Sequence, residues 1–149
     1  MKTISKKSLF IICAVCLVAS LSLVMAASTL TANFGTITVN NTPAAVVITS
    51  ATWGSTTGTV AGDKQSVTFS SIPAMTVEAT TTVNIVVHNN GLTSAAISAA
   101  VSGQGSVLTF TPIGSLPTSV AGHADATFTY TVTAVAAGSV TPSITITWS

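Results

Sequence analysis

The feature that most constrains the fold of this chain is an alternation of apolar residues with small polar ones, mainly threonine. Phe128, Tyr130 and Val132, for example, are separated by single threonines. Successive side chains of a β-strand point to opposite faces, so this pattern predicts strands with one buried face and one hydroxyl-bearing face. The alternating apolar positions are Leu30, Ala32, Phe34, Ile37, Val39, Val67, Phe69, Val83, Ile85, Val87, Phe128, Tyr130, Val132, Ile144, Ile146 and Trp148.

Turn-forming residues divide the predicted strands at short intervals. Glycines and prolines recur between the alternating runs, and no segment after residue 28 has the 3.6-residue period of an amphipathic helix. Asn90-Gly91 lies between two runs and predicts a tight type I′ hairpin, because both residues tolerate positive φ angles. About seven or eight strands, with a turn roughly every ten residues, predict an all-β fold, an immunoglobulin-like antiparallel β-sandwich.

Residues 1–27 have the pattern of a secretory signal helix that is removed on export. Lysines at positions 2, 6 and 7 precede an apolar core over residues 9–24, and Val24-Met25-Ala26 provides a cleavage site. The sequence thus predicts a signal peptide (1–27), an N-terminal strand (28–40) and a sandwich (41–149). The apolar run approaches the roughly 20 residues that span a bilayer, so an uncleaved anchor stays open. A type IV pilin leader cut near Lys7 is a third interpretation.

Charged side chains are scarce after the leader. Lys64 stands against Asp63, Glu78 and Asp125, so the mature net charge is −2. Duplex nucleic acid is bound largely through many lysines and arginines, so this composition argues against a nucleic-acid partner. Both cysteines, at positions 13 and 16, lie within the predicted leader, so we expect no disulfide in the mature chain.

Patterns that carry catalytic or metal chemistry are missing from the sequence. There is no Gly-x-Ser-x-Gly, no glycine-rich phosphate loop and no cysteine nucleophile in the mature chain. His123 and Asp125 could supply two metal ligands, but a site needs three or four, and His88 lies at a different turn. We therefore expect no enzymatic activity, no metal and no cofactor.

Two further features leave alternatives open. Asn40-Asn41-Thr42 is a sequon that makes Asn40 a candidate for N-glycosylation in an exported protein. Trp53, Trp148 and Tyr130 are expected to pack in the core or an interface, and an aromatic platform for carbohydrate is the alternative.

Two stretches resemble cell-adhesion-type immunoglobulin-like repeats of archaeal and bacterial surfaces. The first runs from Ser66 through Val101 and contains TVNIVVHNNGLTSAAISAAV, a valine-rich strand, an Asn-Gly turn and a returning Ala/Ser/Val strand. The second is VAGHADATFTYTVTAVAAGSVTPSITITWS, from Val120 to Ser149, which is similar to the closing half of those repeats. The resemblance implies a sandwich on a cell surface.

A leader followed at once by an alternating segment and one threonine-rich sandwich also resembles subunits of archaeal bundling pili and threads and of the biofilm matrix protein TasA. Those subunits polymerise by lending an N-terminal strand to a neighbour. The resemblance implies a secreted, extracellular filament of identical subunits joined head to tail, with membrane contact only through the leader before cleavage. The side chains that would fill the neighbour's groove are Leu30, Ala32, Phe34, Ile37 and Val39.

Other interpretations of the same sequence remain. The sandwich could act as a monomeric or membrane-anchored adhesin or accessory module, or as a component of a surface layer or viral coat. The segment Leu30–Val39 could also be an ordinary first strand that pairs within its own subunit.

Overall fold

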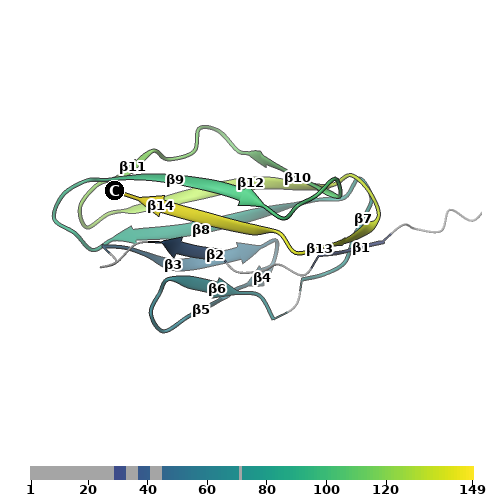
Figure 1. Ribbon diagram of the computed structural model, residues 1–149, viewed down its shortest axis with the longest axis horizontal. Helices are drawn as coiled ribbons and strands as arrows, with labels where there is room; N and C mark the ends of the chain where they lie inside the picture. Colours follow the sequence, from purple (N-terminus) through teal and green to yellow (C-terminus); the bar gives the residue numbers. More distant parts are fainter. Residues whose placement is uncertain (1–28, 33–36, 41–44, 71) are drawn as a thin grey trace, which may run out of the picture.

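A computed structural model describes residues 29–32, 37–40, 45–70 and 72–149 of the chain. The described residues form strands and no helix, and the two larger sheets make a β-sandwich (Figure 1). The all-β sandwich predicted from the alternation is confirmed, and the predicted signal helix lies outside the described residues. Where about seven or eight strands were expected, the described residues form fourteen, several of only two or three residues.

The strands follow one another along the chain with short connections. They are β1 (Thr29–Ala32), β2 (Ile37–Asn40), β3 (Val46–Trp53), β4 (Thr56–Thr57), β5 (Thr59–Val60), β6 (Ser66–Thr68), β7 (Met75–Thr76), β8 (Thr80–Asn89), β9 (Ala95–Ser102), β10 (Leu108–Pro112), β11 (Ser119–Val120), β12 (Asp125–Ala134), β13 (Gly138–Val140) and β14 (Ser143–Trp148).

One layer of the sandwich is a five-stranded antiparallel sheet in the order β10-β12-β8-β3-β4. Its centre is the pair β8 and β12, each ten residues long, in register from Asp125 opposite His88 to Thr133 opposite Thr80. Along both strands buried apolar side chains alternate with half-buried or exposed ones, mostly threonines, as the sequence pattern predicts.

The other layer is a six-stranded sheet in the order β11-β9-β14-β2-β6-β5. A small three-stranded sheet has the order β13-β1-β7, and its strands are the sequence neighbours of β14, β2 and β6. Two pairings are parallel: β2 with β14, and β1 with β13. The sequence suggested only antiparallel pairs. Parallel neighbours need a long crossover, and here almost the whole domain lies between the paired strands.

The core lies between the layers and takes side chains from both. Ile48, Ile85 and Phe128 come from the five-stranded sheet, and Ile37 and Ile144 from the six-stranded sheet, all 0% exposed. Near the edge of the five-stranded sheet, Phe110 meets Trp53 and Tyr130 edge to face, with ring centroids 6.1 and 6.2 Å apart. No helix among the described residues is long and apolar enough to span a membrane.

The tight hairpin predicted at Asn90-Gly91 is wrong. Strand β8 belongs to the five-stranded sheet and β9 to the six-stranded sheet, so residues 90–94 cross between the layers. Neither Asn90 nor Gly91 has a positive φ angle. Instead, the buried Asn89 amide donates to the carbonyl oxygens of Thr93 (2.8 Å) and Val120 (3.2 Å) and accepts from the Gly91 N–H (2.8 Å). These bonds hold the crossing loop in shape and fix it against β11 at Val120.

The sandwich has two distinct ends. At the first, β2 finishes at Asn40 opposite Thr147, β3 begins opposite Asn89, and Ser149 exchanges backbone hydrogen bonds with Ala96. We call this the β2–β3 end. At the other lie β1, β7 and β13, which we call the β1–β13 end. In Figure 1 the marked C-terminus lies at the β2–β3 end and the labels β1, β7 and β13 lie at the opposite side.

Candidate assembly site

Residues 37–40, within the segment predicted as a donor strand, form an interior strand rather than an edge. On one side β2 pairs in parallel with β14, from Ile37 opposite Ile144 to Asn40 opposite Thr147. On the other side β2 pairs antiparallel with β6, with Ile37 opposite Val67. An interior strand satisfies its backbone groups on both sides and covers two edges at once.

Residues 29–32 are enclosed in the same way within the three-stranded sheet. Strand β1 runs parallel to β13, with Leu30 opposite Gly138 and Ala32 opposite Val140. Its other side pairs antiparallel with β7, with Leu30 opposite Met75. The chain therefore enters the sandwich as two successive strands, each held between an element near the C-terminal end of the sequence and one from its middle.

The five predicted plug residues fall as follows. Ile37 is fully buried in the core. Leu30 and Ala32 lie in β1, Val39 lies in β2 opposite Ile146, and Phe34 lies outside the described residues. For Ile37, burial of the side chain contributes about 1.5–3 kcal/mol.

Strand β2 covers an apolar strip that would otherwise be open. Without it, β14 would keep only β9 and β6 only β5 as neighbours. The strip is lined by Val67, Ile144 and Ile146, each 0% exposed in the intact fold. An apolar strip between two unpaired strand edges is the kind of site that an added strand binds. The alternation marked these three residues as core, but no local pattern indicates which strand covers them.

Asn40, the candidate glycosylation site, is the last residue of β2, in register with Thr147. It therefore lies at the β2–β3 end of the sandwich, beside the connection that leads to β3.

Two titratable side chains of the described residues, His88 and Asp125, contact each other. His88 Nδ1 lies 2.7 Å from Asp125 Oδ1, across the β8–β12 ladder, and these side chains are 31% and 62% exposed. His123, expected beside Asp125, is an exposed residue with φ +56° whose N–H donates to the carbonyl of Asn89. Across the described residues, no three His, Cys, Asp or Glu side chains come together as metal ligands.

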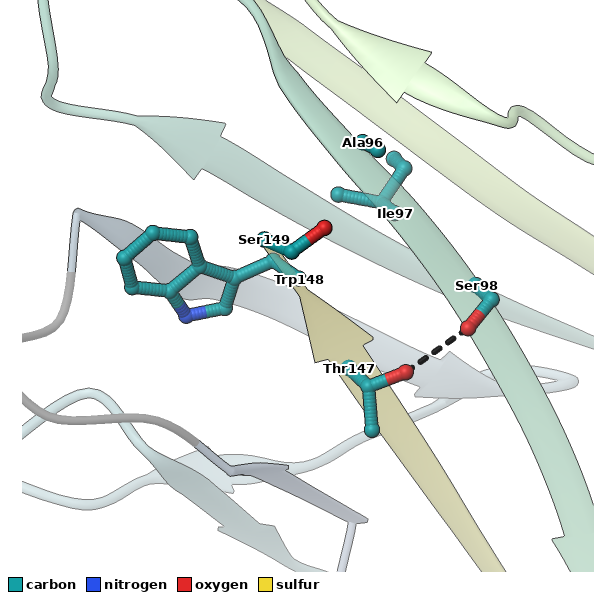
Figure 2. A pocket seen from close by; sticks show the side chains of 6 residues that line it. All are labelled: Ala96, Ile97, Ser98, Thr147, Trp148 and Ser149. Atoms are coloured by element: carbon teal, nitrogen blue, oxygen red, sulfur yellow. Dashed lines mark hydrogen bonds between the residues drawn. The ribbon is translucent and has the colours of Figure 1, made fainter.

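The two tryptophans and the tyrosine all pack in the fold, as predicted. Trp53 and Tyr130 are both 2% exposed, and Trp148 is partly buried against the core. Trp148 also lines a shallow hollow of about 260 Å³ at the β2–β3 end, together with Ile97 and Ser98. Figure 2 shows the Trp148 indole projecting away from the hydroxyl pair of Ser98 and Thr147, whose oxygens are 2.7 Å apart.

Comparisons of the chain with protein-family models, with curated proteins and with solved structures found no match.

Proposed function

We propose that this protein is the structural subunit of an extracellular filament, in which residues 29–40 of one copy fill the β14/β6 and β13/β7 slots of the next. The observation that carries the proposal is that β2, near the start of the mature chain, is an interior strand in contact with the C-terminal strand. Such a strand can be supplied by another chain without changing the sheet, whereas an edge strand would add little if exchanged.

Exchange preserves the contacts that hold the strand. The same registers with β14 and β6, and the same burial of Ile37, form whether β2 comes from its own chain or from a neighbour. The free-energy difference between the exchanged and the intramolecular arrangement then comes from the connection between β2 and β3 and from the entropy of association. High subunit concentration therefore favours exchange. Because each copy donates one strand and accepts one, a copy can be linked to two different neighbours, and the series of linked copies does not have to close.

A second candidate function is a monomeric or membrane-anchored surface module, such as an adhesin. The observation in its favour is that a single chain fills its own slot, with β1 and β2 each paired on both sides. This alternative needs no neighbour, and it predicts the same structure for one copy.

Cysteine cross-linking distinguishes the two functions. Thr38 of β2 and Thr145 of β14 are register partners on adjacent strands, where a disulfide can form. Leaderless Thr38→Cys and Thr145→Cys single variants would be mixed unfolded, refolded together at high concentration and oxidised. The filament function predicts a disulfide-linked dimer that contains one chain of each variant.

The matched control uses Ala100, the register partner of Thr145 on β9. These two residues lie on β9 and β14 of the same sandwich body, meaning the strands from β3 onward, whichever chain supplies β2. Mixed Ala100→Cys and Thr145→Cys variants should therefore give no such dimer. A single chain that carries both Thr38→Cys and Thr145→Cys should close an internal disulfide if β2 stays in its own subunit. If that internal disulfide forms and the mixture of single variants gives no linked dimer, the strand is not exchanged and the monomeric function stands.

A further inference from the structure

The connection between β2 and β3 limits how two strand-exchanged copies can be placed. Strand β2 ends at Asn40, in register with Thr147, and β3 follows Ala45, whose carbonyl accepts a hydrogen bond from the Asn90 N–H. Both points lie at the β2–β3 end. In an exchanged assembly, the chain therefore leaves the acceptor body at its β2–β3 end and enters the donor body at the donor's own β2–β3 end.

The length of the connection keeps those two ends close together. Four residues, 41–44, separate Asn40 from Ala45, and five extended peptide units reach about 17 Å. The sandwich is much longer than that, since the ten residues of β12 alone span roughly 30 Å. A donor body stacked on the β1–β13 end of its acceptor is therefore out of reach.

The β2–β3 end also has the surface that a contact between copies needs. Leu92, in the loop that crosses from β8 to β9, is 87% exposed, more than Ile113 (50%) or Val135 (47%). The backbone of its loop is held beside Ala45, and the hollow lined by Ile97 and Trp148 lies on the same end, at the finish of β14 and the start of β9. The hollow has a mixed lining, with the apolar side chains of Ile97 and Trp148 beside the hydroxyls of Ser98 and Thr147. An exposed leucine and such a hollow on one end give that end both apolar and hydrogen-bonding groups for a contact with a second copy.

We infer that the β2–β3 end is the interface between copies of this chain, with a second copy as its partner and Leu92 at the contact. The inference rests on the proposed strand exchange and adds how two exchanged copies are placed relative to each other. Bodies joined by exchange meet through the same end and direct their β1–β13 ends outward. In a filament built in this way the β2–β3 ends lie along the filament axis. The bodies are not stacked with the β2–β3 end of one on the β1–β13 end of the next.

Single cysteines at the two ends test the arrangement, because the mature chain has none of its own. Leu92→Cys marks the β2–β3 end, and Ser106→Cys, in the exposed turn between β9 and β10, marks the β1–β13 end. Assemblies of each leaderless variant would be oxidised and the linked dimers measured. We expect the Leu92→Cys variant to cross-link and the Ser106→Cys variant to remain largely unlinked.

A charge substitution gives a second readout. Leu92→Asp should raise the concentration at half assembly by roughly tenfold or more, as expected for the lost burial of a leucine. Val135→Asp, which also replaces an exposed apolar residue but at the β1–β13 end, should leave that concentration within about threefold. Both positions are exposed, so both variants should fold as the parent does.

The outcomes separate this inference from the proposed function. If the Thr38→Cys and Thr145→Cys mixture links between chains but Ser106→Cys cross-links as well as Leu92→Cys, exchange occurs and the end-to-end geometry is wrong. The geometry is also wrong if Val135→Asp weakens assembly as much as Leu92→Asp. If no mixture links between chains, both the proposed function and this inference fail.

Discussion

Replacing Asn89 by aspartate tests how the loop between the two layers is held. The Asn89 side chain is 1% exposed, and its amide nitrogen donates to the carbonyl oxygens of Thr93 and Val120. In the Asn89→Asp variant, a carboxylate oxygen would face those two carbonyls, so two attractive contacts become repulsive ones. The bond from the Gly91 N–H could persist, because that contact needs only an acceptor.

The magnitude follows from these contacts. Asn89→Ala removes three hydrogen bonds, each contributing about 0.5–1.5 kcal/mol, so we expect a loss of about 2–4 kcal/mol. Asn89→Asp loses two of them and buries an unpaired charge, which costs about 3–5 kcal/mol near pH 7. Asn90→Asp, one residue along and exposed, should change stability by less than about 0.5 kcal/mol.

The Asn89→Asp variant should also acquire a pH dependence of known sign. Burial and the two carbonyl oxygens would raise the pKa of the new carboxyl group in the folded state above its unfolded value near 3.9. The folded state then binds the proton more tightly than the unfolded state does. The variant's loss of stability relative to the parent is therefore smallest below the unfolded pKa and grows as the pH rises through the folded pKa. Urea unfolding followed by tryptophan fluorescence measures it. A variant as stable as the parent at neutral pH would refute the proposed role of the amide.

Three other substitutions test the fold by the same unfolding assay. Tyr130→Phe should stabilise by up to about 1 kcal/mol, because the Tyr130 hydroxyl is buried with no hydrogen-bond partner among the described residues. Burial raises the pKa of Tyr130 above 10.0, so its protonated form is favoured in the fold, and the parent should lose stability above that pH where the variant does not. Gly103→Ala should cost about 1–3 kcal/mol, since φ is +71° and the new Cβ would lie 2.5 Å from the Thr141 carbonyl oxygen, whereas Gly62→Ala meets nothing within 4 Å. Ile37→Ala should cost about 2–5 kcal/mol, and the half-buried Thr38→Ala much less.

The strands were predictable because their signal is local. In β8 and β12 the buried residues, such as Val83 and Phe128, recur at every second position, as expected for a sheet with one face on the core. The same pattern placed Ile37 on the apolar face of its strand, and Trp53 was expected to pack because it is an aromatic residue at a strand end.

Long-range pairing was not predictable from such patterns. Ile37 and Ile144 lie side by side, but nothing in either segment specifies its partner or the parallel direction. Asn90-Gly91 suggested a hairpin because dipeptide preferences describe the turn and not the sheets it joins. The contact of Asp125 with His88, rather than with the nearer His123, likewise follows from the β8–β12 register.

The central claim is that copies of this chain polymerise through residues 29–40. Its most direct test is electron microscopy of the leaderless protein after refolding at high concentration. The account predicts filaments that become shorter as a variant lacking residues 28–40 is added during refolding, because that variant accepts a strand and cannot donate one. Separate single-copy particles at every concentration, unchanged by the truncated variant, would contradict it.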